Sequence, residues 1–285
     1  MKLNRIDLSD IHAPRQLARA LHDRMGPTST AIPIVDIAYA LDIDDVRQDT
    51  FDGLEGMLLT DPRRSQGRIL ANTRYGPRRA RFTVAHELGH FLLERHLLSD
   101  ADGFRCLPAD LRETREGKAH LRQESEANTF AIEVLAPAPM VSPYLKNVPD
   151  LRSAQNMRDH LEVSLEACIR RIIELSPEPL AAIWSLNGHI RYFAKSGKFP
   201  YVTCRRGDRL PQTSAAFRAV NKGTSGFTDM AETPALAWTG NPDIEVREQT
   251  RVARNGHAVT LLWADLPEDE EDDGGLPELG TPRFR

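Results

Sequence analysis

Residues 86 to 90 of this chain combine residue types and spacing that can do chemistry. They read HELGH, with two histidines four positions apart and a glutamate directly after the first. In an α-helix, residues four apart lie one turn apart on the same face, so both imidazoles can point at one metal ion. A carboxylate beside that ion can take a proton from water, as peptide hydrolysis by zinc requires. We therefore predict His86 and His90 as metal ligands and Glu87 as the general base.

A metal ion held by two histidines needs a further protein ligand. Residues 118–135 have helical periodicity, and Glu124 falls on their apolar stripe. Because a carboxylate on such a stripe is costly unless it is paired or bound to a cation, Glu124 is favoured as the third ligand over the competing carboxylate Glu126, whose stripe is more polar. Asn128 follows on the same face, where its amide can hydrogen-bond a ligand histidine and fix the orientation of the ring.

His96 offers a rival ligand set, because it reproduces the outer spacing of the pattern HExxHxxGxxH. The glycine that turns the chain in that pattern is replaced here by Leu93. We predict a helix over residues 82–95 with Thr83 as its N-cap. Without a glycine turn, this helix places His96 about 120° around the axis from His90 and about 9 Å further along it. We therefore predict that His96 is a helix-end histidine that interacts with the helix dipole.

The elements that must position these residues are short. Helical spacing predicts helices over 12–26 and 33–41, and the apolar runs 56–60 and 68–72 predict a β-hairpin directly before the metal helix. If one hairpin strand is an edge, residues 68–72 would hold an extended substrate by strand addition. Residues 99–117 lack a strong period and are predicted to be a loop or short helices bordering the site.

The spacing of apolar residues changes between residues 150 and 175. Two helices with a turn at 162–164 are predicted there, which resembles a helix-turn-helix with Arg170 and Arg171 on its second helix. The segment has only modest positive charge, so a structural or partner-docking role is favoured over DNA binding.

The chain beyond residues 176–179 is predicted to form a smaller α+β domain. Asn-Gly pairs at 187–188 and 255–256 indicate hairpin turns, and the acidic end of the chain is predicted to be disordered. The predicted elements are strands over 180–186, 188–194, 236–238, 244–249 and 258–263 and a helix over 215–220.

Composition limits the class of protein. The chain has 285 residues, 40% of them apolar, and a net charge of −4, which argues against a global attraction to nucleic acid. Cys106, Cys168 and Cys204 form no CxxC pair and are predicted to be reduced and structural. The first residues have no signal-peptide core and no apolar run is long enough to span a bilayer, so we expect a cytoplasmic protein without membrane contact.

The HELGH segment, the RFTVA before it and the later ESEANTFAIEVLAP starting at Glu124 together resemble the ImmA/IrrE family of metallopeptidases. The resemblance extends over roughly residues 10–145. It implies an α+β, minimal gluzincin-like zinc protease core of helices and a small β-sheet, with His86, His90 and Glu124 as Zn²⁺ ligands and Glu87 as the base. Some family members act in the cytoplasm by cleaving a helix-turn-helix repressor.

We accordingly expect a zinc metallopeptidase domain at 1–145, a helix-turn-helix-like segment at 146–177, an α+β domain at 178–266 and an acidic tail at 267–285. The leading hypothesis is a cytoplasmic zinc endopeptidase that cleaves a helix-turn-helix repressor or antitoxin-like regulator and so relieves repression. The alternative is a metal-containing regulator that binds a partner protein or DNA without proteolysis. Glu87 favours the enzyme, because a purely structural metal site needs no base.

Overall fold

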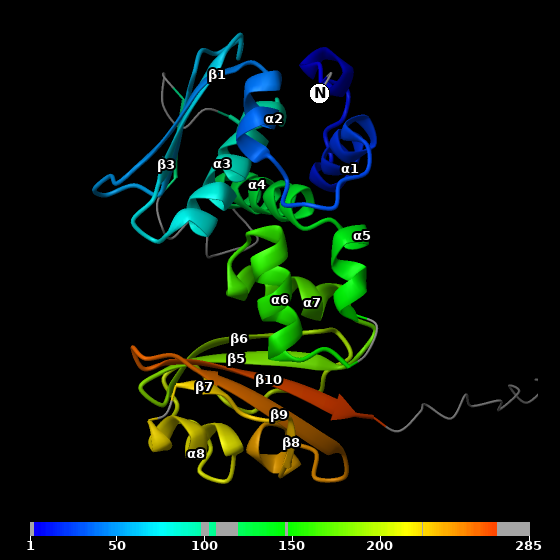
Figure 1. The fold of residues 1–285 in the computed structure, drawn as a ribbon, viewed down its shortest axis with the longest axis vertical. Coiled ribbons are helices and arrows are strands. Elements are labelled where there is room, and N and C mark those ends of the chain that lie inside the picture. Colours follow the sequence, from blue (N-terminus) through cyan, green and yellow to red (C-terminus); the bar gives the residue numbers. More distant parts are fainter. Residues whose placement is uncertain (1–2, 98–102, 107–118, 146–147, 224, 267–285) are drawn as a thin grey trace, which may run out of the picture. The chain divides into compact units, whose positions relative to one another are not determined.

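The computed structural model describes residues 3–97, 103–106, 119–145, 148–223 and 225–266 (Figure 1). The chain separates into two compact units, Met1–Pro177 and Glu178–Arg285. Helices and strands occur in both units, so the predicted α+β class is confirmed. The finer division of the first unit into a peptidase domain and a helix-turn-helix-like segment stays a prediction. No helix among the described residues is long and apolar enough to cross a membrane.

A four-stranded sheet in the order β1-β3-β2-β4 forms one layer of the first unit. Strands β2 (Gly56–Thr60) and β3 (Gly67–Asn72) form the predicted hairpin, β1 (Ile43–Asp49) is parallel to β3, and β4 (Gly103–Cys106) is antiparallel to β2. Both hairpin strands are thus paired on each side. The strand-addition hypothesis for residues 68–72 is therefore wrong.

Strand β4 also corrects the prediction of a loop or short helices over residues 99–117. The four residues of β4 extend the sheet beside β2, whereas the rest of that stretch lies outside the described residues. A four-residue strand is too short to show a period of its own, which is why the sequence pattern missed it.

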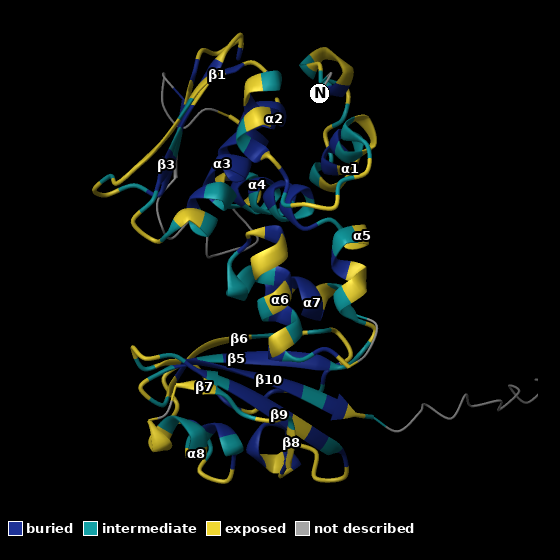
Figure 2. Ribbon diagram, in the orientation of Figure 1, coloured by how far each residue is buried: buried dark blue, intermediate teal, exposed yellow. Residues whose placement is uncertain are grey.

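Helices cover this sheet and carry the core of the first unit. Helix α3 (Pro77–Leu92) packs against β2 and β3 and against α4 (Ala119–Leu135), while α1 (Pro14–Met25) packs on α4. Figure 2 shows α3 as largely buried. The remaining helical elements of this part are η1 (Arg5–Leu8), α2 (Ile34–Ala40), α5 (Ala138–Val141) and η2 (Ser142–Leu145).

The start of α3 differs from the prediction. The helix begins at Pro77, directly after Gly76, whose φ is 93°. Proline suits the first helical position because the amide it lacks would have no partner within the helix. Thr83 lies in the second turn, buried, with its hydroxyl donating to the carbonyl of Arg79, so the prediction that it caps the helix is wrong.

Helices α6 (Leu151–Leu161) and α7 (Leu165–Leu175) confirm the predicted helix pair between residues 150 and 175. Arg171 of α7 is 1% exposed and donates to the carboxylates of Glu133 and Glu174 and to the carbonyl of Ala136. It therefore holds α7 against the end of α4 and is excluded as a DNA contact.

The second unit contains a sheet in the order β6-β5-β10-β9-β7, with β8 also paired to β9 and α8 packed on β9. Asn187 and Gly188 both have positive φ, 50° and 76°, as a tight hairpin turn requires. The elements are β5 (Leu180–Leu186), β6 (His189–Lys195), α8 (Ala215–Lys222), β7 (Gly226–Phe227), β8 (Ala231–Thr233), η3 (Ala235–Ala237), β9 (Glu245–Val252) and β10 (His257–Asp265).

One predicted strand of this unit is wrong. Residues 236–238 belong to a 3₁₀ turn and its C-cap, because the buried Trp238 reaches inward and donates its indole N–H to the buried carboxylate of Glu248. A short apolar run does not by itself distinguish a strand from a buried turn. Strands β7 and β8 were not predicted, and the acidic tail lies outside the described residues.

The two cysteines whose side chains are described, Cys168 and Cys204, are buried free thiols. Burial raises the pKa of Cys168 to about 12, so its thiol stays protonated at neutral pH. The expectation of reduced, structural cysteines is confirmed for these two, whereas the side chain of Cys106 lies outside the described residues.

Candidate metal centre

Helices α3 and α4 bring three metal-binding side chains together. The Nε2 atoms of His86 and His90 lie 3.1 Å apart. Glu124 reaches across from α4, with Oε2 3.2 Å from Nε2 of His86 and Oε1 3.3 Å from Nε2 of His90. All three side chains are buried. The two-helix arrangement places Glu124, and not Glu126, beside the histidine pair.

The donor atoms fit a metal ion. A tetrahedral zinc ion with ligand bonds of about 2.0–2.2 Å separates its ligand atoms by about 3.3 Å, close to the spacing of His86, His90 and Glu124. Among the described residues, no other group of His, Cys, Asp or Glu side chains is arranged to share an ion. Two imidazoles and a carboxylate suit zinc and related divalent ions.

The charges of these groups also favour a cation. Burial lowers the pKa of His90 to about 3, so its imidazole is neutral at pH 7. Burial alone would raise the pKa of Glu124, but its contacts with the imidazoles of His86 and His90 outweigh burial and hold the pKa below its usual value. At neutral pH, His90 therefore offers a neutral imidazole and Glu124 an ionised carboxylate, the forms that bind a metal.

Glu87 is fully buried on α3, next to His86 in the sequence, and faces the start of β2. A Cβ atom on Gly56 would collide with Oε1 of Glu87 and with Cγ2 of Thr83. Gly56 therefore permits the close approach of strand and helix that confines the carboxylate. Sequence reasoning missed Gly56, although a glycine that opens a strand is the signal for such an approach.

Asn128 lies where the sequence predicts it. Its Oδ1 atom is 3.0 Å from Nδ1 of His86, the ring nitrogen that does not face Glu124. A carbonyl oxygen there accepts a proton from Nδ1 and leaves Nε2 with a free lone pair for a metal.

The position of His96 contradicts the prediction. Helix α3 ends at Leu92, and Leu93 adopts φ −80° and ψ 81°, so the chain turns without a glycine. His96 is buried, with Nδ1 2.9 Å from Nδ1 of His90. It thus contacts the outer nitrogen of His90, a candidate ligand, but does not join the candidate metal-binding group.

Glu126 is also less exposed than its stripe suggested. Its side chain is 14% exposed, and its Oε2 atom lies 3.0 Å from Nε2 of His96. Arg95 and Arg122 form ion pairs with the same carboxylate. The sequence indicated a solvated helix end near His96 and a solvated Glu126. In the structure, His96 is buried in a turn and Glu126 packs against it.

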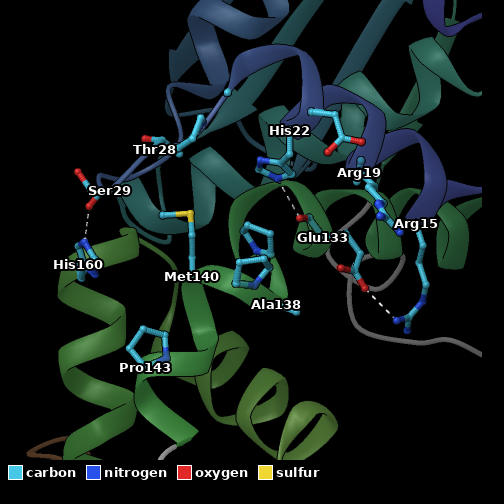
Figure 3. A pocket seen from close by; sticks show the side chains of 16 residues that line it. Arg15, Arg19, His22, Thr28, Ser29, Glu133, Ala138, Met140, Pro143 and His160 are labelled. Carbon is cyan, nitrogen blue, oxygen red and sulfur yellow. Dashed lines mark hydrogen bonds and ion pairs between the residues drawn. The ribbon is translucent and has the colours of Figure 1, made fainter.

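A cavity of about 980 Å³ in the first unit is lined by α1, residues 26–29, the end of α4, α5 and His160 (Figure 3). Arg15 forms an ion pair with Glu133 in its wall, and His22 contacts the carbonyl of Val134. None of the proposed ligands or the base lines it, so the cavity is distinct from the candidate metal centre.

The candidate site thus combines the HELGH helix, a carboxylate from a second helix and a small sheet beside them. Residues 40–172 match the family model for Peptidase M78, the IrrE N-terminal-like domain. This segment is thus similar to the ImmA/IrrE family of metallopeptidases.

Two known proteins illustrate the extent of the likeness. The radiation response metalloprotease IrrE of Deinococcus radiodurans is 33% identical over 115 residues, which cover 39% of this chain and 32% of that protein. The match thus spans about a third of the length of the curated relative. A solved structure of a Mycobacterium tuberculosis transcriptional regulator has a TM-score of 0.53 at 15% identity and covers 92% of both chains, which shows a similar fold.

Proposed function

We propose that this protein is a zinc-dependent endopeptidase with His86, His90 and Glu124 as metal ligands and Glu87 as the general base. The observation that carries this proposal is that the Nε2 atoms of His86 and His90 lie 3.1 Å apart and that each lies within 3.3 Å of an oxygen of Glu124. The buried carboxylate of Glu87 follows His86 on the same helix. The match of residues 40–172 to the IrrE N-terminal-like domain supports a metallopeptidase.

A zinc ion bound there would supply Lewis-acid activation of water and of the scissile carbonyl. Glu87 accepts a proton from the attacking water and later donates it to the leaving amine. Gly56 leaves room for the Glu87 carboxylate between α3 and β2. Asn128 accepts a hydrogen bond from Nδ1 of His86 and so keeps the ring turned toward Glu124.

We propose a helix-turn-helix transcriptional regulator, of the repressor or antitoxin-like kind, as the substrate, and relief of repression as the outcome. The resemblance to the ImmA/IrrE family supports this substrate class. The similarity to the radiation response metalloprotease IrrE of Deinococcus radiodurans supports a link to stress. A cytoplasmic location stays a prediction.

The first test searches the neighbouring genes for one that encodes a helix-turn-helix regulator and combines that regulator with the purified protein, with zinc or with a chelator. We expect zinc-dependent cleavage by the wild type. Glu87→Gln should bind zinc with wild-type affinity but cleave at least about 10²- to 10⁴-fold more slowly, because the proton acceptor is lost. Glu166→Gln, a matched change at a half-exposed position of α7, should cleave normally.

The same experiment separates the enzyme from the alternative, a regulator that binds without proteolysis. Stable complex formation with no zinc-dependent cleavage would favour the alternative, and normal cleavage by Glu87→Gln would remove Glu87 from its assigned role. The helix pair α6–α7 remains available for partner docking, although Arg171 is buried between helices.

A further inference from the structure

The outer nitrogen of His90 has a partner that the metal-binding group does not explain. Nε2 of His90 faces Glu124 and His86, whereas Nδ1 lies 2.9 Å from Nδ1 of His96. A neutral imidazole has one protonated ring nitrogen and one ring nitrogen with a free lone pair, and only the second can bind a metal ion. The group that contacts Nδ1 of His90 therefore decides whether Nε2 can bind a metal.

The turn after α3, which carries His96, is stabilised by a residue from the loop between β2 and β3. Arg64, in the loop between β2 and β3, is buried and donates to the carbonyls of His90, Phe91 and Leu93 at 2.7, 3.1 and 2.9 Å, and also to that of His96. These carbonyls at the helix end have no helical partners of their own. The guanidinium thus stabilises the turn in place of a glycine.

The far side of His96 meets a carboxylate. Oε2 of Glu126 lies 3.0 Å from Nε2 of His96, and Arg95 and Arg122 fix the same side chain. An ionised carboxylate only accepts hydrogen bonds, so His96 donates from Nε2. A neutral imidazole has one proton, so Nδ1 of His96 then accepts, and Nδ1 of His90 donates.

We propose that Glu126 and His96 form a hydrogen-bonded relay that fixes the proton of His90 on Nδ1 and directs its Nε2 lone pair into the metal site. His96 and Glu126 are positioning residues that act through His90. The relay plays the same part for His90 that Asn128 plays for His86, where an amide oxygen accepts from Nδ1. It differs in ending on the Glu126 carboxylate, which Arg95 and Arg122 hold by ion pairs. It rests on the metal site proposed above.

Zinc affinity, measured by competition with a chromogenic chelator, tests the relay. His96→Phe removes the acceptor while preserving bulk, and we expect about 10- to 100-fold weaker zinc binding. His96→Asn places an amide oxygen near the position of Nδ1 and should recover most of the affinity. His22→Phe is the matched control, because His22 also contacts α4, through the carbonyls of Glu133 and Val134, but no metal ligand.

A second variant separates the relay from a general loss of packing. Glu126→Gln has nearly the same shape, but its amide can donate as well as accept, so it no longer fixes the proton of His96. We expect weaker zinc binding with an unchanged melting temperature of the metal-free protein. The double variant His96→Phe/Glu126→Gln should match His96→Phe alone, because Glu126 acts through His96.

Several outcomes would overturn the relay. These are wild-type zinc affinity in both His96→Phe and Glu126→Gln, an equal loss in His22→Phe, or losses that add in the double variant. A wild-type protein that does not bind zinc would instead contradict the proposed function. Tight binding by the wild type with no loss in the variants contradicts the relay alone.

Discussion

At the scale of single residues, the position of the Glu87 carboxylate depends on the absence of a Cβ atom at Gly56. Gly56→Ala would force the Glu87 carboxylate away from β2, because a Cβ there overlaps Oε1. Since a displacement of about 1 Å can cost about 10²-fold in rate, we expect a loss of that order in kcat/KM with unchanged zinc affinity.

The control for this prediction is Gly197→Ala, since a Cβ at Gly197 meets nothing within 4 Å. Both variants are assayed for cleavage of the same regulator and for zinc binding. Wild-type kcat/KM in Gly56→Ala would show that the contact with the strand does not position the base.

The buried histidines make the metal-free protein sensitive to acid. Burial lowers the pKa of His90 to about 3 and that of His96 to about 4, from 6.5 in the unfolded chain. Between about pH 6.5 and about pH 5 the unfolded state therefore binds more protons, so the free energy of unfolding decreases as the pH falls. The stability contributed by neutral burial is fully present only above about pH 6.5.

Thermal unfolding of the metal-free protein across this range measures the effect. The melting temperature should fall with pH, and His96→Asn should show a shallower fall because one titrating group is gone. A flat profile between about pH 6.5 and about pH 5 would contradict neutral burial of these imidazoles.

At the scale of elements, Arg171 and Arg170 are neighbours on α7 with opposite surroundings. Arg171 is 1% exposed and bonded to Glu133, whereas the side chain of Arg170 is 45% exposed. Arg171→Met leaves the Glu133 carboxylate without its buried partner, so we expect the free energy of unfolding to fall by about 3 kcal/mol or more.

The matched change Arg170→Met should alter stability by no more than about 0.5 kcal/mol, as is usual for a surface position. Chemical denaturation of both variants gives the comparison. Equal stabilities would mean that the contacts of Arg171 do not hold α7 to α4. Nucleic-acid binding that is lost in Arg170→Met alone would reopen a DNA-contacting role for this helix.

At the scale of the whole molecule, the chain divides after Pro177, within the boundary predicted at residues 176–179. The candidate metal centre, the Glu126–His96 relay and the contacts of Arg171 all come from the first unit. A chain that ends at residue 177 should therefore bind zinc within about threefold of the full-length affinity, because none of these contacts is removed.

Circular dichroism would first establish that the shortened chain is folded, and chelator competition would then give its zinc affinity. A folded fragment that binds zinc more than about tenfold more weakly would show that residues 178–285 contribute to the site. Cleavage of the regulator by the fragment would report separately on whether the second unit helps to recognise the substrate.

The spacing of residues along the sequence is sufficient to predict helices α3 and α4 and the residues that they direct toward the candidate metal centre. HELGH and the register of Glu124 and Asn128 depend only on the helical repeat, which holds wherever the helix lies. The same reasoning located the hairpin before α3 and the helices α6 and α7, because each carries a complete local pattern.

Contacts between distant segments supplied the rest, and no local pattern encodes them. The turn after Leu92 forms without glycine because Arg64, more than 25 residues earlier in the chain, binds the end of α3. That turn returns His96 to His90, and the approach of β2 places Gly56 against Glu87. Helical periodicity fixes which residues share a face, but only the packing of separate elements fixes what each face meets.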